Sequence, residues 1–397
     1  MSEVAHTPQL RFPEFNGEWD THSIGKIGTF FSGGTPTSSN KDYYSGTIPF
    51  IGSGKISSES VKQHITQEAL DSSSAKIVNE GDLLYALYGA TSGAVALSKI
   101  NGAINQAVLC IRTNENKFFL KTWLEKNKER ILGTYLQGGQ GNLSAQIVKS
   151  LKLNLPTKPE QQKIAAFLTV VDNKIEQLSK KQALLGEYKK GLMQKIFSQA
   201  IRFKADDGSD FPDWEDGLLN TLIDNSRKIR YGIVQPGKYD KNGKYLIRGK
   251  DYSNGWEIPS EFFKVSDAIE KKYSKTRVKK GDVIVCIVGS VGNVMVIPGW
   301  LDGANITQTT ARIAPDKNKL NNQYLYFYFQ SLVGRNMIHK HTRVGTRPGL
   351  NIEDVEKFSI LLPSLLEQAK IANFLSSIDN KIEQVGKQLD ESKQFKK

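Results

Sequence analysis

Apolar residues recur at alternating intervals of four and three positions in two segments of the chain, residues 158–200 and 365–397. This heptad spacing is typical of a coiled coil, in which two helices pack along one narrow apolar seam. The expected seam residues are Ile164, Leu168, Val171, Ile175, Leu178 and Leu185 in the first segment, and Ile371, Leu375, Ile378, Ile382, Val385 and Leu389 in the second.

The two seams complement each other. Gln182 interrupts the first seam at the position where the second seam has Leu389, and Ser392 interrupts the second where the first has Leu185. Each helix therefore offers an apolar side chain where the other has none. We expect the two helices to pair with each other as an antiparallel coiled coil.

The segments before the two seams are residues 1–157 and 201–364, and their apolar and polar positions follow no single helical or strand period. Short apolar runs between stretches of glycine, serine and threonine predict strands with long loops, and helices are expected near 118–132 and 322–338. The uncharged run 283–301 is broken by glycines and a proline, so it predicts two strands around a turn rather than a membrane span. The expected fold class is α+β, with two similar globular domains of mixed sheet and helix joined by the two long helices.

The chain is an internal duplication. Residues 160–177 and 367–384 are identical at 13 of 18 positions, at a constant offset of 207. Weaker matches relate residues 10–19 to 201–214, 81–89 to 281–289, and 101–108 to 302–310. The repeat therefore covers nearly the whole chain, with small insertions in the globular parts. Such a molecule has pseudo-two-fold symmetry, and this symmetry places the two related helices antiparallel.

The net charge and the cysteines indicate the kind of partner and the cellular compartment to expect. The 397 residues carry a net charge of +13, which favours a polyanionic partner such as nucleic acid. Cys110 and Cys286 lie in apolar, strand-like runs, and C-x-x-C is absent, so both are expected to be buried free thiols. The first residues lack the apolar core of a signal peptide, and we expect a cytoplasmic protein without a membrane contact.

Two similar domains on a rigid helical pair could read two halves of one DNA site. A helix of about 36 residues is about 54 Å long, which exceeds one turn of B-DNA, about 34 Å. The helices would then set the gap between the half-sites. Identical subunits read a palindrome, whereas two halves that have diverged are expected to read an asymmetric sequence.

Loop residues of the two copies supply candidates for DNA contacts. Gln140 aligns with Arg347 at offset 207, and glutamine can pair with adenine and arginine with guanine in the major groove. The alternative interpretation is a plain turn before a helix capped by Ser144 or Asn351. Basic side chains suit phosphates and polar ones suit base edges, although each could also belong to a solvated surface loop. The expected DNA-binding residues are Thr35, Lys41, Tyr43, Lys55, Tyr88, Gln137, Gln140, Asn142, Arg227, Arg230, Tyr231, Gln235, Arg248, Lys250, Arg343 and Arg347.

Enzyme motifs are missing or incomplete. No Pro-Pro dipeptide occurs, so the N/D-P-P-Y motif of amino-methyltransferases is absent, and no G-x-G-x-x-G follows a strand. Residues 52–55 resemble part of a P-loop, but Pro49 stands where the first glycine should be and Ile56 replaces Ser or Thr. Among the histidines only His339 and His341 lie close together, which is too few for a metal site. We therefore expect no catalytic residue and no bound metal.

The chain resembles the specificity subunits of type I restriction–modification systems. The resemblance rests on LRFPEF…W (10–19) with its echo RFKADDGSDFPDW (202–214), and on the paired LP…EQxKIAxFLxxxDNKIE segments at 155–176 and 362–383. It implies two target-recognition domains (1–157 and 201–364), each reading one half of an interrupted double-stranded DNA site. It also implies that the helices, 158–200 and 365–397, form the spacer and bind modification subunits.

The same resemblance implies that the chemistry lies on partners. Two modification subunits would carry S-adenosylmethionine and methylate adenine, and two restriction subunits would carry ATP-dependent, Mg²⁺-dependent translocation and cleavage. No cofactor is expected on this chain. The second copy departs from the first at its end, because it stops at residues 395–397, which match 188–190, and has no equivalent of 191–197. The alternatives are a non-catalytic scaffold or orphan DNA-binding protein, and a stand-alone methyltransferase or nuclease.

Overall fold

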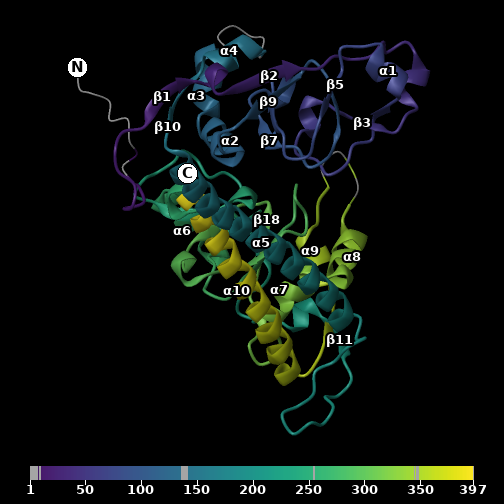
Figure 1. The fold of residues 1–397 in the computed structure, drawn as a ribbon. Helices are drawn as coiled ribbons and strands as arrows, with labels where there is room; N and C mark the ends of the chain where they lie inside the picture. The colour runs from purple at the N-terminus through teal and green to yellow at the C-terminus, as the bar shows by residue number, and fades with distance from the viewer. Residues whose placement is uncertain are drawn as a thin grey trace. The chain divides into compact units, whose positions relative to one another are not determined.

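The computed structural model describes residues 8, 10–135, 142–253, 255–343, 345 and 348–396 (Figure 1). The chain divides into two compact units. The first unit contains residues 1–176 and 391–397, and the second contains residues 177–390. Both long helices therefore contribute to both units. In the described part of the chain, no helix is both long and apolar enough to cross a lipid bilayer.

Short sheets form the globular part of the first unit. In order across each sheet, the strands are β1 (Asp20–Ser23) and β10 (Lys152–Leu155); β2 (Gly28–Ser32), β9 (Val108–Thr113), β6 (Leu83–Ala86) and β7 (Val95–Leu97); and β4 (His64–Ile65), β3 (Ile48–Ile51), β8 (Gly102–Ile104) and β5 (Lys76–Val78). Neighbouring strands run antiparallel, except β3 and β8, which are parallel and pair Ile51 with Ile104.

The second unit repeats this arrangement. In order across each sheet, its strands are β11 (Glu215–Leu218) and β19 (Ser359–Leu362); β12 (Arg230–Tyr231), β18 (Thr310–Ile313), β15 (Val283–Cys286) and β16 (Val294–Val296); and β14 (Phe263–Val265), β13 (Lys244–Ile247) and β17 (Asn305–Ile306). Here β13 and β17 are the parallel pair, with Ile247 opposite Ile306. The shared strand orders confirm the predicted α+β class and the two similar domains.

The central strands are buried on both faces, which explains their continuous apolar sequences. In β15, Val283 and Val285 point into one hydrophobic core, whereas Ile284 and Cys286 point into another. Strand β6 divides its side chains in the same way, and the core on one of its faces contains Cys110. Both cysteines are buried free thiols, as predicted. The uncharged run 283–301 forms β15 and β16 around a turn, also as predicted.

The shorter helices also occur in equivalent pairs. They are α1 (Gln67–Asp71) and α6 (Asp267–Lys272), α2 (Lys117–Lys126) and α7 (Asn322–Gln330), α3 (Lys128–Tyr135) and α8 (Leu332–His341), and α4 (Ala145–Ser150) and α9 (Ile352–Glu356). Helix was predicted near 118–132 and 322–338, and the structure confirms it, with two helices in each region. The breaks fall at Asn127, which caps the end of α2, and at Ser331, whose hydroxyl caps the start of α8.

The two long helices are α5 (Lys158–Phe197) and α10 (Leu365–Lys396), which Figure 1 draws in dark teal and yellow. In the second unit, Lys189 pairs with Asp379 at 2.6 Å, and Gln182 lies against Gly386. The contacts advance by seven residues on α5 while they recede by seven on α10. The helices are therefore antiparallel, as predicted. The second-unit seam residues Ile371, Leu375, Ile378, Val385 and Leu389 are buried.

Helix pairing in the first unit uses equivalent residues. Lys396 pairs with Asp172 at 2.6 Å, and the rings of Phe167 and Phe395 meet edge to face. At the repeat offset of 207, Asp172 corresponds to Asp379 and Lys189 to Lys396. One ion pair is thus present twice, once in each copy of the repeat.

Candidate nucleic-acid interface

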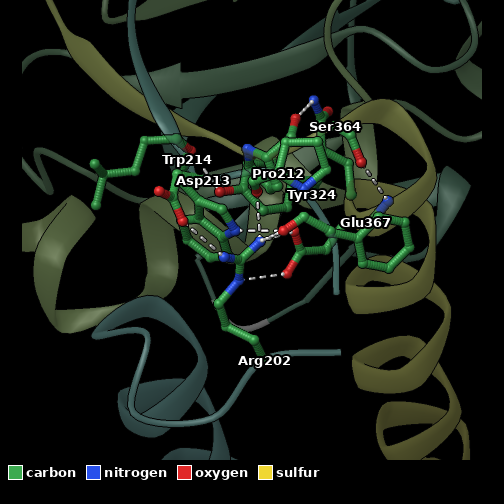
Figure 2. Close-up of polar contacts among 11 residues, drawn as sticks. Arg202, Pro212, Asp213, Trp214, Tyr324, Ser364 and Glu367 are labelled. Atoms are coloured by element: carbon green, nitrogen blue, oxygen red, sulfur yellow. Dashed lines mark hydrogen bonds and ion pairs between the residues drawn. The ribbon is translucent and has the colours of Figure 1, made fainter. Parts of the chain in front are cut away.

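In each unit, a buried glutamate in the first turn of the long helix binds side chains of the globular part. In the second unit, Arg202 donates from Nε and Nη2 to the two carboxylate oxygens of Glu367 at 3.2 and 2.8 Å (Figure 2). Trp214 donates its indole N–H to the same carboxylate at 3.0 Å. The Glu367 side chain is fully buried, so this bidentate pair works in a site shielded from water. Arg202 also donates to the carbonyl oxygen of Pro212, which closes the loop that precedes β11.

The first unit contains the same cluster. Arg11 donates to both oxygens of Glu160 at 2.7 Å, and Trp19 donates to Glu160 at 3.3 Å. The Glu160 side chain is only 1% exposed. The repeated R-F…W and E-Q motifs therefore share one structural role, which is to hold each domain on its helix.

The glutamine that follows each glutamate makes further hydrogen bonds between the long helix and the globular part. Gln161 accepts a hydrogen bond from the Asn116 N–H at 2.9 Å and donates to the Pro156 carbonyl oxygen. Gln368 accepts from the Asn321 N–H at 2.8 Å and donates to the Pro363 carbonyl oxygen. Asn116 and Asn321 cap the starts of α2 and α7. The long helix, the neighbouring short helix and the incoming strand are thus connected through one buried amide in each unit.

Several loops of the first unit meet at the turn 105–107, between β8 and β9. Gly33 donates its N–H to the Asn105 carbonyl oxygen, and Leu87 donates to that of Ala107. The Leu143 N–H in turn reaches the Leu87 carbonyl oxygen at 2.9 Å. A Cβ at Gly33 would lie 1.7 Å from the Ile104 carbonyl oxygen, so this approach requires glycine. We name the loops that meet here, with the turn 105–107, the first loop cluster.

The first loop cluster includes several predicted DNA-binding residues. Thr35 is exposed and hydrogen-bonds through its hydroxyl to the Gln106 amide oxygen at 2.6 Å. Exposed Lys55 ends a 3-10 turn, Ser53–Lys55, which contacts the turn Gly89–Thr91 that follows Tyr88. Asn142 is exposed and precedes Leu143. Lys41 and Tyr43 belong to a separate 3-10 turn, Lys41–Tyr44, where Tyr43 packs on the small core around Phe50.

The second unit has an equivalent loop cluster at the turn 307–309. Gly232 donates to the Thr307 carbonyl oxygen, and Ile287 donates to that of Thr309 at 2.8 Å. Leu350 then donates to the Ile287 carbonyl oxygen. A Cβ at Gly232 would lie 1.8 Å from the Ile306 carbonyl oxygen, so glycine is required here as well. We name this group of loops the second loop cluster.

Most of the predicted residues of the second unit belong to or flank the second loop cluster. Arg230, Tyr231 and Gln235 are exposed and surround the contact of Gly232 with Thr307. Lys250 is exposed and lies just after β13, whose Ile247 carbonyl oxygen accepts from Thr307.

Arg343 pairs its N–H with the Gly349 carbonyl oxygen, and its guanidinium lies 3.6 Å from Asp354. The prediction that Ser144 caps a helix is confirmed, since its hydroxyl accepts from the Ile147 N–H, and Asn351 precedes α9. Gln137, Gln140 and Arg347 lie outside the described residues.

Two predicted arginines are engaged by buried carboxylates. Arg227 makes two hydrogen bonds of 2.6 Å to Asp282, and Arg248 binds Asp251 through Nε and Nη2 at 3.1 and 2.9 Å. Both carboxylate side chains are 4% exposed or less. Each guanidinium group is neutralised by a carboxylate and kept in one position by two hydrogen bonds. Both arginines therefore stabilise the conformation of the adjacent loops.

Sequence reasoning missed the residues at the centre of each loop cluster. Gln106 and Gln308 occupy equivalent positions, one residue after Asn105 and Thr307 respectively, and both are exposed. The detectable signal was the match of residues 101–108 with 302–310, which places a glutamine in each turn. An exposed amide on a turn supported by several loops is chemically suited to pair with an adenine edge.

The loop clusters expose side chains that can bind nucleic acid. Among the described residues, no group of three or more His, Cys, Asp or Glu side chains is arranged to hold a metal ion. The exposed groups of the loop clusters are amides, hydroxyls, lysines and arginines, which suit phosphates and base edges.

Comparisons with known proteins identify the family to which the chain belongs. Residues 16–185 and 223–391 match the family described as the type I restriction modification DNA specificity domain. The chain is similar to the specificity subunit of the Escherichia coli type I restriction enzyme EcoBI, with 25% identity over 98% of this chain and 80% of that protein. It is also similar to the MjaVIII specificity subunit of Methanocaldococcus jannaschii, with 27% identity over 98% of this chain and 92% of that protein.

Solved structures share the fold. The S subunit of a type I restriction–modification system from M. genitalium gives a TM-score of 0.61 at 17% identity and covers 98% of this chain and 96% of its own. A chain from a structure of type I R-M complex assembly gives a TM-score of 0.56 at 18% identity, with coverages of 98% and 97%.

Proposed function

Because the chain belongs to the family of type I restriction–modification DNA specificity subunits, we propose that it reads an interrupted, asymmetric DNA site, one half-site per domain. Residues 1–157 and 201–364 are the two target-recognition domains. Residues 158–200 and 365–397 set the gap between the half-sites and bind modification subunits. The chain performs no catalysis itself.

The observation that carries this proposal is the pair of equivalent loop clusters. Each presents an exposed glutamine, Gln106 or Gln308, on a turn held by backbone hydrogen bonds from several loops. A preorganised amide of this kind can make the bidentate contact to adenine that discriminates between bases. The sequence-specific contacts are therefore assigned first to these two glutamines.

The side chains around the glutamine differ between the two loop clusters. This difference supports an asymmetric DNA site. Asn105 of the first cluster corresponds to Thr307 of the second, and Tyr88 corresponds to Val288. A different set of donors and acceptors recognises a different base sequence. Arg230 and Lys250 in the second unit, and Lys41 and Lys55 in the first, are assigned to phosphates.

The chemistry of modification and cleavage is assigned to other subunits. Two modification subunits bind the helices and carry S-adenosylmethionine, and two restriction subunits carry ATP and Mg²⁺. Helix α5 has 40 residues. At about 1.5 Å per residue it extends about 60 Å, which is longer than one turn of B-DNA.

The decisive experiment is co-expression of the chain with a matching modification subunit in cells that lack DNA methylation, followed by sequencing for methylated adenine. The expected result is one new methylated motif with two unlike halves and a fixed gap. A co-purifying complex without methylation would favour a scaffold, especially if DNA binding had no sequence preference and a shallow salt dependence. Methyl transfer or DNA cleavage by the purified chain alone, with S-adenosylmethionine or Mg²⁺, would reveal an enzyme instead.

A further inference from the structure

The second unit contains a buried arginine that forms no ion pair in the part of the chain that the structure describes. Arg312 lies in β18 and is only 1% exposed, although arginine stays charged at neutral pH. Its Nη2 donates to the backbone carbonyl oxygens of Lys228 at 2.8 Å and Lys275 at 3.4 Å. Its Nε has no hydrogen-bond partner among the described residues. Such a charge lowers the stability of a folded chain unless a partner compensates it, so the presence of Arg312 needs a reason other than stability.

The charges that act on Arg312 leave it without a partner of its own. Asp282 is close enough to act on Arg312 electrostatically, but its carboxylate binds Arg227 at 2.6 Å. Arg230 lies directly opposite Arg312 in the β12–β18 pair, so both side chains belong to the same face of the sheet. Burial lowers the pKa of Arg312, and the positive charges of Arg227 and Arg230 lower it further. Like charges directly opposite each other destabilise a sheet.

The first unit has apolar residues at the equivalent positions. Ile284 pairs with Arg312 across the second sheet, and its equivalent Leu84 pairs with Cys110. On its other side, Cys110 pairs with Phe31 of β2. The second copy of the repeat thus has two arginines where the first has a phenylalanine and a cysteine. Arginines are therefore not required to form this sheet.

The edge strand of the second unit has fewer backbone pairs than its equivalent. Strand β2 pairs with β9 over five residues, whereas β12 pairs with β18 at Arg230 and Tyr231 only. The hydrogen bond from Arg312 to the Lys228 carbonyl oxygen lies two residues before this short strand and extends its attachment to β18. Arg230 and Tyr231 are exposed and adjoin Gly232, whose N–H contacts the second loop cluster.

We propose that Arg312 is a positioning residue for DNA binding by the second domain. It holds the start of β12, and its charge directs the opposite guanidinium of Arg230 outward, toward a DNA phosphate. The phosphate supplies the negative charge that the free chain does not provide at this place. The inference rests on the proposed function and adds to it a buried residue that acts through Arg230.

The main test is Arg312→Met, which keeps an unbranched side chain but removes the charge and the donors. Its midpoint of urea unfolding should equal or exceed that of the wild-type chain, because a buried charge without a carboxylate partner is lost. Hydrogen–deuterium exchange should become faster in residues 228–235 and stay unchanged in the first unit. Arg312→Lys, which keeps the charge and a donor, should restore slow exchange in part.

DNA binding is measured by fluorescence anisotropy on the full chain with its modification subunit, across a range of salt concentrations. The probes are a labelled duplex with the motif found by methylation sequencing and a labelled duplex of random sequence. Arg312→Met should weaken binding to both duplexes about fivefold at physiological salt and reduce the slope of log Kd against log salt by about 0.9, as the loss of one phosphate contact predicts. The methylated motif itself should not change, because phosphate contacts carry no base information.

The variant Arg230→Met shows whether Arg312 acts through Arg230. It should reduce the affinity and the slope by the same amounts, and the double variant should bind no more weakly than Arg230→Met alone. Ile313→Val, which truncates the next buried side chain of β18, is the control for stability. It should lower the unfolding midpoint and leave the salt slope unchanged.

The inference is overturned if Arg312→Met fails to fold or unfolds at a much lower urea concentration, because Arg312 would then serve the core. Additive losses in the double variant, or an unchanged salt slope, would overturn it as well. A wild-type chain that shows no preference between the two duplexes would contradict the proposed sequence reading, and the slopes would still decide the role of Arg312.

Discussion

Lys189 on α5 and Asp379 on α10 form an ion pair with a nitrogen–oxygen distance of 2.6 Å, and Lys189 also lies 5.0 Å from the centre of the Phe327 ring. The equivalent residues Lys396 and Asp172 form the same pair at 2.6 Å in the first unit. These contacts fix the register of the helices, because a shift of one residue on either helix would separate both pairs. The helix pair is thus suited to hold a defined length.

That register predicts how the DNA spacer responds to insertions. One heptad inserted between Gln182 and Ala183, together with one between Val385 and Gly386, should keep the helices paired and lengthen them by about 10 Å. The methylated motif should then gain about three base pairs in its gap while both half-sites stay unchanged. The same insertion in α5 alone should abolish methylation, because Lys189 no longer faces Asp379. Full methylation with an unchanged gap in the doubly extended chain would contradict the spacer role.

The buried glutamate that fastens each domain predicts a stability effect. Glu367→Gln removes the charge that Arg202 and Trp214 bind in a fully buried site, and should cost about 1–3 kcal/mol of unfolding free energy. Glu160→Gln should have a similar effect through Arg11. Urea unfolding followed by circular dichroism measures both. The exposed substitution Glu383→Gln on the same helix as Glu367 is the control and should change stability by less than about 0.5 kcal/mol.

The long helices and the duplication could be predicted because their signals are local or strictly repeated. Ile371 and Leu375 recur at heptad spacing, and a one-dimensional pattern is enough to predict a coiled coil. The alternation of Val283 and Ile284 between two cores likewise follows from a continuous apolar run in a strand.

The loop clusters could not be predicted, because backbone hydrogen bonds between distant segments build them. Gln106 lies between Asn105 and Ala107, whose carbonyl oxygens accept hydrogen bonds from Gly33 and Leu87, and the repeat alone does not show that these distant segments meet there. Arg227 and Arg248 were predicted from their charge alone. Sequence does not reveal that Asp282 and Asp251 lie within hydrogen-bonding distance of them.

The buried thiols predict an absence of reactivity in the folded chain. Burial raises the pKa of the Cys110 thiol to about 12 and also raises the pKa of Cys286. Because the thiolate is the nucleophile, neither residue should react with Ellman's reagent at pH 8 unless the chain unfolds. Both should react in guanidinium chloride. Rapid reaction of Cys110 without denaturant would show that the sheet opens around β9.

The pair of Glu270 and Arg277 predicts part of the acid sensitivity of the second domain. The hydrogen bond from Arg277 lowers the pKa of Glu270 below its ordinary value of 4.5. A lowered folded-state pKa adds stability that is fully present above pH 4.5 and is lost as the pH falls below it. The wild-type chain should therefore be more stable than Glu270→Gln at pH 7, and the difference should shrink below pH 4.5. A difference in unfolding free energy that stays constant across this range would contradict the assignment.

The equivalent glutamines predict separable effects on the two half-sites. Gln106→Ala removes an amide from the first loop cluster, where Thr35 holds it in place, and should relax or change recognition of one half-site only. Gln308→Ala should do the same for the other half-site. A lost bidentate base contact corresponds to about 1–3 kcal/mol of discrimination, which would appear as methylation of sites that differ by one base pair in the affected half.

The measurement is sequencing of methylated adenine in cells that express each variant with the modification subunit. Gln67→Ala, an exposed glutamine on α1 outside both loop clusters, is a control for loss of an amide and should leave both half-sites unchanged. Loss of discrimination in both halves from Gln106→Ala alone would mean that the two domains do not read DNA independently. If both glutamine variants keep the original specificity, other loop residues must recognise the bases. If each variant changes only its own half-site, the turns 105–107 and 307–309 are the centres of base recognition in the two domains.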